Sequence, residues 1–194
     1  MTLTEAYRNV REFYNKSNPN ESDEFILVES LSFIIAETKD PDAMVDLGGF
    51  YYGKREFDLA LKYYEMAAEY DQLDALIGLG YIWYYGRTGQ VDYKKAFEYY
   101  SKAKELGDMV AAYKVADMYR NGYYVEKNKD AYKEIILSLY KNLIEKESFS
   151  PFDPIPEVFT RLAAIYTEEG NIEKAIGLYK QAKDVLEYRI HRSP

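Results

Sequence analysis

Few residues in this sequence could carry out catalysis or bind a metal ion. The chain has no cysteine, which excludes disulfides, thiolate catalysis and cysteine metal sites. Its only histidine, His191, stands near the last residue, where we expect a solvated side chain. Because the sequence contains no histidine pair and no acidic calcium-binding loop, we predict neither a metal site nor a cofactor.

Two short motifs resemble catalytic or ligand-binding elements only in part. The glycine-rich stretch 86–89 (Gly-Arg-Thr-Gly) lacks the Lys-Ser/Thr of a phosphate-binding loop, and no strand precedes it, so we predict a turn between helices. Glu168 and Glu169 form a carboxylate pair at the end of a predicted helix. Solvation of a turn explains that pair more simply than acid–base catalysis, which requires a cleft that shifts a pKa. We therefore predict no catalytic residues and no enzymatic activity.

Composition excludes several partner classes. Hydrophobic residues make up 47% of the chain, charged residues make up 30%, and the net charge is -8. An acidic surface repels phosphate backbones, which disfavours nucleic acid as a partner. No segment approaches the ~18 apolar residues that a membrane span requires. The polar N-terminus does not resemble a signal peptide, so we expect a cytoplasmic protein without a membrane partner; a trimmed leader stays an open alternative.

Tyrosine is over-represented in the composition, with 22 in 194 residues. Many fall on predicted core positions, but others lie on the helix face opposite the predicted core. An aromatic face in a groove is typical of an interaction surface, because tyrosine provides rigid contact area and a hydroxyl. The alternative is packing between adjacent repeats, and the sequence leaves both interpretations open. The candidate partner-binding residues are Tyr52, Ile77, Tyr81, Tyr84, Tyr85, Tyr113, Asp117 and Arg120.

Apolar residues recur at helical spacing in the segments that carry these side chains. Apolar spacing predicts helices over residues 2–15 and 23–38, and Thr2 with Glu5 matches a capping box. Asp40 is expected to cap the next helix, with a proline at its first position. From there a two-helix pattern recurs, with its leucine-type position at Leu47, Leu79, Val115 and Leu162.

Small and large residues alternate within this pattern. Small ones, such as Gly48, let two helices approach closely, and large ones, such as Tyr64 and Tyr179, are expected to fill the gaps between them. One helix pair cannot bury both of its faces, so neighbouring pairs must stack.

These positions resemble the tetratricopeptide repeat and its relative, the Sel-one-like repeat. The tetratricopeptide pattern of Leu-Gly, an aromatic three residues on, then Ala-x3-aromatic is matched by Leu47-Gly48, Tyr51, Ala60 and Tyr64. The middle copy is similar to the Sel-one-like form, with a longer turn at 86–92 followed by Lys95-Ala96, Tyr99-Tyr100, Lys102-Ala103 and Gly107-Asp108. The third copy departs from the pattern, since it lacks the aromatic of the second helix.

The resemblance implies an all-α fold, an α-solenoid of about five stacked antiparallel helix pairs in a single domain. Its parts would be an N-terminal helix pair (1–40), two repeats (42–72 and 74–107), a divergent repeat (108–146), a proline-rich insertion (147–156) and a C-terminal repeat (157–189). Within the insertion, Asp153 is expected to cap the final helix pair. A true domain boundary in this proline-rich stretch stays open as the alternative.

The family also implies a function. Proteins of this kind act mostly as scaffolds or adaptors, with the first helix of each pair lining a concave groove. We therefore expect a non-enzymatic adaptor that binds a peptide or protein segment in that groove, where the aromatic residues provide anchors and Arg120 pairs with a carboxylate or a backbone carbonyl. The alternative is a small regulatory protein that acts through homo-oligomerisation of its stacked repeats.

Overall fold

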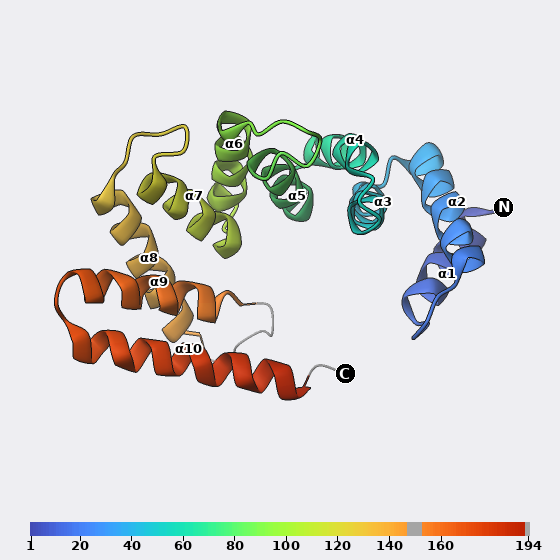
Figure 1. The fold of residues 1–194 in the computed structure, drawn as a ribbon. Helices are drawn as coiled ribbons and strands as arrows, with labels where there is room; N and C mark the ends of the chain where they lie inside the picture. Colours follow the sequence, from blue (N-terminus) through green and yellow to red (C-terminus); the bar gives the residue numbers. More distant parts are fainter. Residues whose placement is uncertain (147–152, 193–194) are drawn as a thin grey trace. The chain divides into compact units, whose positions relative to one another are not determined.

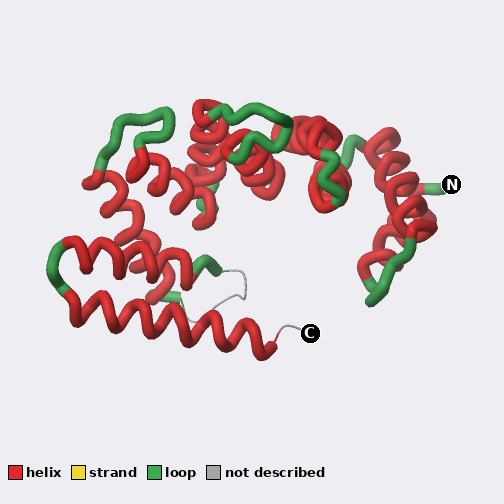
Figure 2. Tube along the Cα trace, in the orientation of Figure 1, coloured by secondary structure: helices red, strands yellow, loops and turns green. Residues whose placement is uncertain are grey.

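The computed structural model describes residues 1–146 and 153–192, which form ten α-helices and no strand (Figures 1 and 2). The predicted all-α class is confirmed. The helices are α1 (Leu3–Tyr14), α2 (Glu21–Thr38), α3 (Pro41–Gly53), α4 (Phe57–Ala68), α5 (Leu73–Tyr84), α6 (Tyr93–Glu105), α7 (Met109–Asn121), α8 (Lys129–Ile144), α9 (Ile155–Glu168) and α10 (Ile172–Arg192).

The chain divides into two compact units, Met1–Tyr99 and Tyr100–Pro194, and the boundary falls inside α6. The predicted proline-rich insertion lies mostly outside the described residues, because 147–152 are not among them.

Side chains define where several helices begin. The predicted capping box at Thr2 is present, since its hydroxyl accepts from the Glu5 backbone N–H and the Glu5 carboxylate accepts from the Thr2 backbone N–H. Asp40 accepts from the Asp42 backbone N–H, with proline at the first helical position, as expected. The cap predicted at Asp153 is wrong: α9 begins at Ile155, its N-cap position is Pro154, and no side chain caps it. The Asp153 carboxylate instead accepts from Lys146 Nζ at 2.5 Å.

In the first unit, successive helices pack against one another from α1 to α5. Tyr64 on α4 lies between α3 and α5, and only 8% of its surface is exposed. A Cβ atom added to Gly48 would lie 2.7 Å from the Tyr64 ring, and one added to Gly78 would lie 2.6 Å from it. The expected close approach at Gly48 is thus confirmed, and burial raises the pKa of Tyr64 to about 12.

In the second unit, α7 packs on α8, α8 on α9, and α9 on α10. Leu143, Val158 and Leu162 are fully buried in its core. The expectation that Tyr179 fills a gap between helices is wrong, because 45% of its surface is exposed. The physical reason is that Tyr179 lies on α10, and no described helix follows α10 to cover it.

Candidate functional site

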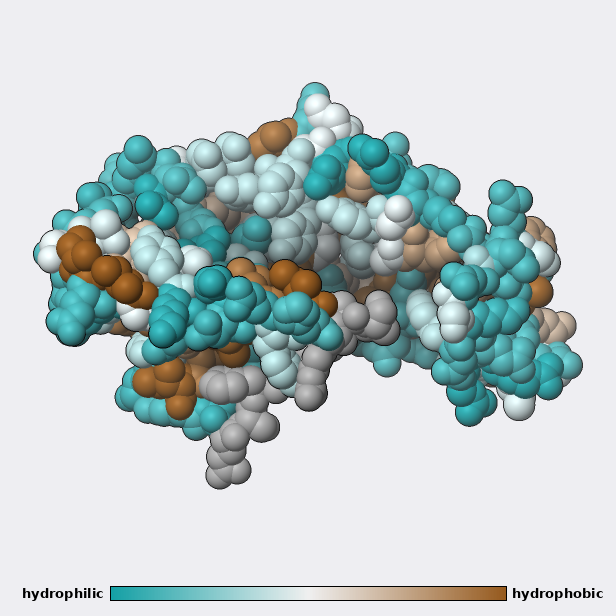
Figure 3. Space-filling model, turned by 60° about the horizontal axis from the view of Figure 1, so that its bottom comes forward, coloured by the Kyte–Doolittle hydropathy of each residue, from teal (hydrophilic) through white to brown (hydrophobic). Residues whose placement is uncertain are grey.

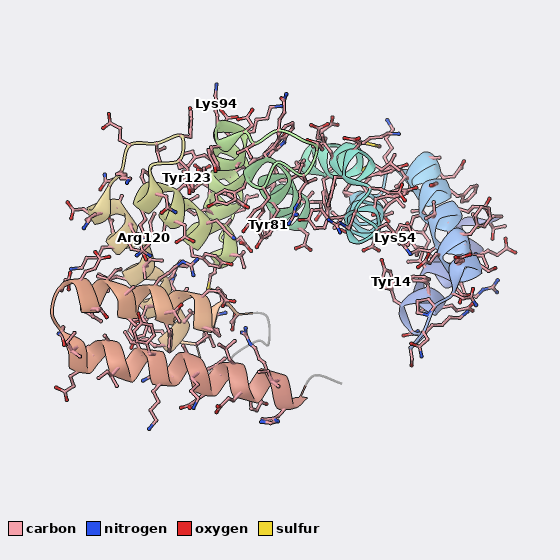
Figure 4. All side chains as sticks on the ribbon, in the orientation of Figure 1. Tyr14, Lys54, Tyr81, Lys94, Arg120 and Tyr123 are labelled. Atoms are coloured by element: carbon pink, nitrogen blue, oxygen red, sulfur yellow. The ribbon has the colours of Figure 1, made fainter. Side chains whose placement is uncertain are left out.

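The candidate residues fall into two groups, one in each unit. The first group lies around the C-terminal end of α5 and the turn that follows it. We call it the aromatic cluster; its members are Tyr52, Phe57, Tyr81, Tyr84, Tyr85, Arg87 and Tyr93. The second group lies on α7 and α9. Figure 4 labels one residue of each group, Tyr81 and Arg120.

Ring contacts connect four of the predicted tyrosines. Tyr85 stacks on Tyr81 with ring centroids 5.9 Å apart, and it meets Tyr84 edge-on at 4.9 Å. The Tyr85 ring also lies 5.2 Å from the Arg87 guanidinium, which is 5.6 Å from the Phe57 ring. The Phe57 ring in turn contacts Tyr52 at 5.3 Å. The structure thus brings Tyr52, Tyr81, Tyr84 and Tyr85 into one connected cluster.

Three members of this cluster were not predicted from the sequence to bind a partner: Phe57, Arg87 and Tyr93. Arg87 belongs to the turn that was correctly predicted at 86–89, where Gly86 and Gly89 have positive φ. That turn returns the chain to α6, whose first residue, Tyr93, contacts Tyr84 at 5.5 Å. The arginine between aromatic positions was the available signal, since a guanidinium stacks readily on rings.

The side chains of the aromatic cluster differ in how much of their surface is exposed to solvent. Tyr85 exposes 46% of its surface, whereas Tyr52, Tyr81 and Tyr84 are half-buried, as is Ile77 one turn before Tyr81 on α5. Because its rings pack against one another, the cluster contributes to the packing of the unit. Among the aromatic members, Tyr85 has the most surface left for another molecule.

The second group lines an open groove of about 370 Å³ between α7 and α9, called here the α7–α9 groove. Asp117, Arg120 and Asn121 come from α7, and Thr160, Arg161 and Ala164 come from α9. Helical spacing explains the arrangement: Ala112, Val115 and Ala116 turn one face of α7 into the core, so the intervening polar residues face outward.

Asp117 and Arg161 form a bidentate ion pair across this groove. Asp117 Oδ1 accepts from Arg161 Nε at 2.8 Å, and Oδ2 accepts from Arg161 Nη2. Arg161 Nη1 also donates to the Glu157 carbonyl at 2.8 Å. Burial lowers the pKa of Arg161, but the hydrogen bond and the charge of Asp117 outweigh burial and raise the pKa above its ordinary value. Arg161 therefore stays charged and fixed in position.

Tyr113 lies beneath this pair. Only 7% of its surface is exposed, and its ring centroid is 4.5 Å from the Arg161 guanidinium carbon. Tyr113 belongs to the core of the second unit. It therefore supports Arg161 from below and offers little surface of its own to a ligand.

Arg120 is held less firmly than Arg161. Its guanidinium carbon lies 5.4 Å from the Tyr132 ring centroid, and Nη2 lies 3.7 Å from Glu168 Oε1. The Arg120 side chain is 43% exposed, and Glu168 is shared with Lys129 at 3.5 Å. Ion pairs this exposed are weak, so a ligand could redirect the Arg120 guanidinium at small cost.

The α7–α9 groove thus has a rigid floor and, beside it, hydrogen-bond donors that can change their orientation. Asp117 and Arg161 neutralise one another at the floor, and the Thr160 hydroxyl donates to the Pro156 carbonyl of its own helix at 2.7 Å. Arg120 and the exposed Asn121 amide remain available to reorient toward a ligand. Both are hydrogen-bond donors, which suits carbonyl or carboxylate oxygens.

A second hollow of about 430 Å³ lies elsewhere in the second unit, beside α7 and α8. Ile135 lines it, and this is the position at which the other copies of the repeat carry a tyrosine. The missing ring of the divergent third copy therefore coincides with a hollow in the packing of the second unit.

The described residues contain neither a metal-binding cluster nor a helix that could cross a membrane. Across 1–146 and 153–192, no three histidine or carboxylate side chains gather as a metal site would need. None of the described helices has both the length and the apolar character that crossing a membrane requires.

Comparison with known proteins identifies the repeat. The family model described as "Sel1 repeat" matches residues 41–69, 73–108, 110–131 and 164–184. No curated protein matches the sequence. Among solved structures, the chain is similar to a Sel1 repeat protein from Oxalobacter formigenes, with a TM-score of 0.70 and 21% identity over 94% of this chain and 71% of that one.

Two further structures share the all-α repeat fold. One is c5321, a protective antigen of uropathogenic Escherichia coli strains that displays an SLR fold; its TM-score is 0.66 at 17% identity, covering 99% of this chain and 41% of that one. The other is MamA, with a TM-score of 0.56 and 15% identity over 98% of both chains. At these identities, the similarity establishes the solenoid fold alone.

Proposed function

Because this chain belongs to the Sel1 repeat family, we propose that it is a non-enzymatic adaptor that holds a segment of a partner protein in the α7–α9 groove. Members of this family typically mediate protein–protein interactions. The observation that carries the proposal is the groove itself, which places Arg120 and Asn121 beside the fixed Asp117–Arg161 pair.

Three features of the groove favour an extended peptide as its ligand. It is open, so a chain can lie along it without a lid having to move. Its floor is electrically neutral, because the Asp117 carboxylate balances the Arg161 guanidinium. Its adjustable groups, Arg120 and Asn121, donate hydrogen bonds, and an extended peptide presents unpaired carbonyl oxygens along its backbone. A partner carboxylate beside Arg120 would compete with Glu168 for the guanidinium.

The aromatic cluster of the first unit offers a second contact surface in this proposal. Tyr85 provides exposed ring area and a hydroxyl, and its stacking on Tyr81 and on Arg87 holds the ring in place. A preorganised ring loses little conformational entropy when a partner packs against it. Tyr52, Tyr84 and Ile77 would form the partly buried surroundings of that contact.

Site-specific photo-crosslinking tests the α7–α9 groove as a binding site. A photoreactive residue, p-benzoylphenylalanine, is placed at Asn121 in the groove or, as a control, at Lys141, an exposed position on α8 of the same unit. After irradiation in native lysate, we expect one partner segment to be joined to position 121 and not to position 141. Mass spectrometry identifies that segment.

Arg120→Glu in the same chain is expected to remove the crosslink at position 121, because it reverses the charge that the partner meets. Lys141→Glu makes the same change of charge outside the groove and is expected to leave the crosslink intact. Equal labelling at positions 121 and 141, or a crosslink that persists with Arg120→Glu, would refute the proposed site.

A further inference from the structure

The outer face of α10 carries an exposed apolar stripe. Its members recur at alternating intervals of four and three residues, and Lys183 occupies one of the positions. We call it the α10 stripe; it consists of Ile172, Ile176, Tyr179, Lys183, Leu186 and Ile190. The exposed fractions of its apolar members are 51% for Ile172, 62% for Ile176, 45% for Tyr179, 45% for Leu186 and 71% for Ile190. A four-three spacing of apolar residues is the pattern of a helix that pairs with another helix along its length.

The neighbouring side of α10 already has its partner. Ala175, Leu178 and Ala182 are buried in the core of the second unit, where α10 packs along α9 (Figure 1). The α10 stripe therefore extends the apolar surface of α10 beyond the part that α9 covers. Contiguous apolar residues left exposed beside a buried face commonly mark an interaction surface.

In two earlier repeats, the position equivalent to Tyr179 is buried. Tyr179 occupies the position that Tyr64 and Tyr100 occupy in earlier copies. Those two tyrosines are 8% and 0% exposed, and Tyr64 is covered in part by the helix of the following repeat at Gly78. The position that Tyr179 occupies is thus one that, in the repeat containing Tyr64, a helix of the following repeat covers.

The residue order of the α10 stripe is self-complementary. If two α10 helices lie antiparallel with Gln181 of each at the centre, Ile172 of one copy lies opposite Ile190 of the other. In the same register, Ile176 lies opposite Leu186, and Tyr179 lies opposite Lys183, where a lysine can pack over a ring. Every apolar position then meets a partner, and a two-fold interface requires this reciprocity.

The exposed area is sufficient for such a pairing. Five large apolar side chains, each about half exposed, present on the order of 100 Å² apiece, so two copies would cover about 1,000 Å², the lower limit for a specific interface. Figure 3 shows a face that is mainly hydrophilic, with apolar residues gathered in separate patches.

From the spacing, the exposure and this register, we propose that the α10 stripe is a homodimer interface, in which α10 of a second copy of this chain pairs antiparallel with the first. The inference goes beyond peptide binding in the α7–α9 groove and does not depend on it.

Analytical ultracentrifugation of the full chain over a range of concentrations tests the interface. The wild-type chain is expected to form a dimer, and Ile176→Glu is expected to raise the dissociation constant at least tenfold, because it places a carboxylate in the apolar seam. Ile176 is 62% exposed, so the variant should keep its circular dichroism spectrum and melting temperature. Ile144→Glu is the matched control, since Ile144 is 52% exposed on α8 and lies outside the stripe; it should leave the dissociation constant unchanged.

Disulfide trapping tests the register. Because the chain has no cysteine, Ile176→Cys and Leu186→Cys can be introduced in separate chains without background. On mild oxidation of a mixture, we expect the crosslink between position 176 of one chain and position 186 of the other to exceed both homodimeric products. A wild-type chain that stays monomeric at millimolar concentration, or a mixture dominated by 176–176 and 186–186 crosslinks, would overturn the proposal. A partner of another kind on the stripe would give the first of these results.

Discussion

Gly78→Ala is expected to lower the free energy of unfolding by about 1–3 kcal/mol, although alanine favours helices over glycine by ~1 kcal/mol. The added methyl group would lie 2.6 Å from Cε2 and 2.8 Å from Cζ of Tyr64. Tyr64 cannot retreat easily, because on its other side the position of a Cβ at Gly48 is only 2.7 Å from the ring. The ring and the helix must therefore move apart, which loosens the contact between α4 and α5.

Gly49→Ala is the matched control for this substitution. Gly49 lies on α3, is exposed, and a Cβ there would lie 3.7 Å from Tyr64 Oη, an ordinary contact. This variant should gain up to ~1 kcal/mol from helix propensity. Urea unfolding followed by far-ultraviolet circular dichroism and by tyrosine fluorescence measures both changes and tests whether the transition is two-state.

Testing Gly78→Ala in a chain that lacks the Tyr64 ring separates steric conflict with that ring from other causes of destabilisation. In a Tyr64→Leu chain, the ring that the new methyl group would meet is absent, so Gly78→Ala should cost much less than in the wild type. If Gly78→Ala stabilises the wild-type chain as much as Gly49→Ala does, Tyr64 does not hold the neighbouring helices together in the way described here.

Arg161→Met is expected to lower the free energy of unfolding by about 2–4 kcal/mol. The side chains of Arg161 and Asp117 are 21% and 18% exposed, so losing the guanidinium leaves a mostly buried carboxylate without its charged partner. The Glu157 carbonyl also loses a donor, and Tyr113 loses the cation above its ring. Thermal and urea unfolding measure the loss.

The exposed Lys133–Glu169 pair provides the control for this prediction. Its side chains are 41% and 40% exposed, so Lys133→Met should change stability much less than Arg161→Met does. Removing both members of the buried pair, with Asp117→Leu and Arg161→Met together, should cost less than Arg161→Met alone, because no charge is left unpaired. A loss for Arg161→Met no larger than that for Lys133→Met would show that the pair does not hold α7 against α9.

The sequence predicted the helices and the local contacts well, because their causes are local. The capping box at Thr2, the cap at Asp40 and the small residue Gly48 follow from spacing within one or two helices. The turn at 86–89 follows from glycines whose backbone adopts positive φ. Each of these features was confirmed.

The features that the sequence analysis missed depend on contacts between distant residues. Arg161 was not among the candidate residues, yet it pairs with Asp117 across 44 positions. The proline-rich stretch lies between them in the sequence. Because this stretch interrupts the helical periodicity, the spacing of residues does not predict which residues of α9 lie opposite which residues of α7. For the same reason Tyr113 was expected to be an exposed anchor, whereas α9 places Arg161 over its ring. Helical periodicity shows which face of a helix is apolar but does not show which helix covers that face.

Isothermal titration calorimetry with the partner segment identified by crosslinking measures whether the α7–α9 groove binds a protein segment through Arg120. Arg120→Glu and Lys141→Glu change the net charge equally, and only Arg120 lines the groove. We predict that Arg120→Glu weakens binding of the synthetic segment at least tenfold, which corresponds to about 1.4 kcal/mol, whereas Lys141→Glu leaves the affinity within twofold of the wild type. Equal affinities for the two variants would show that Arg120 does not contribute to binding of the segment.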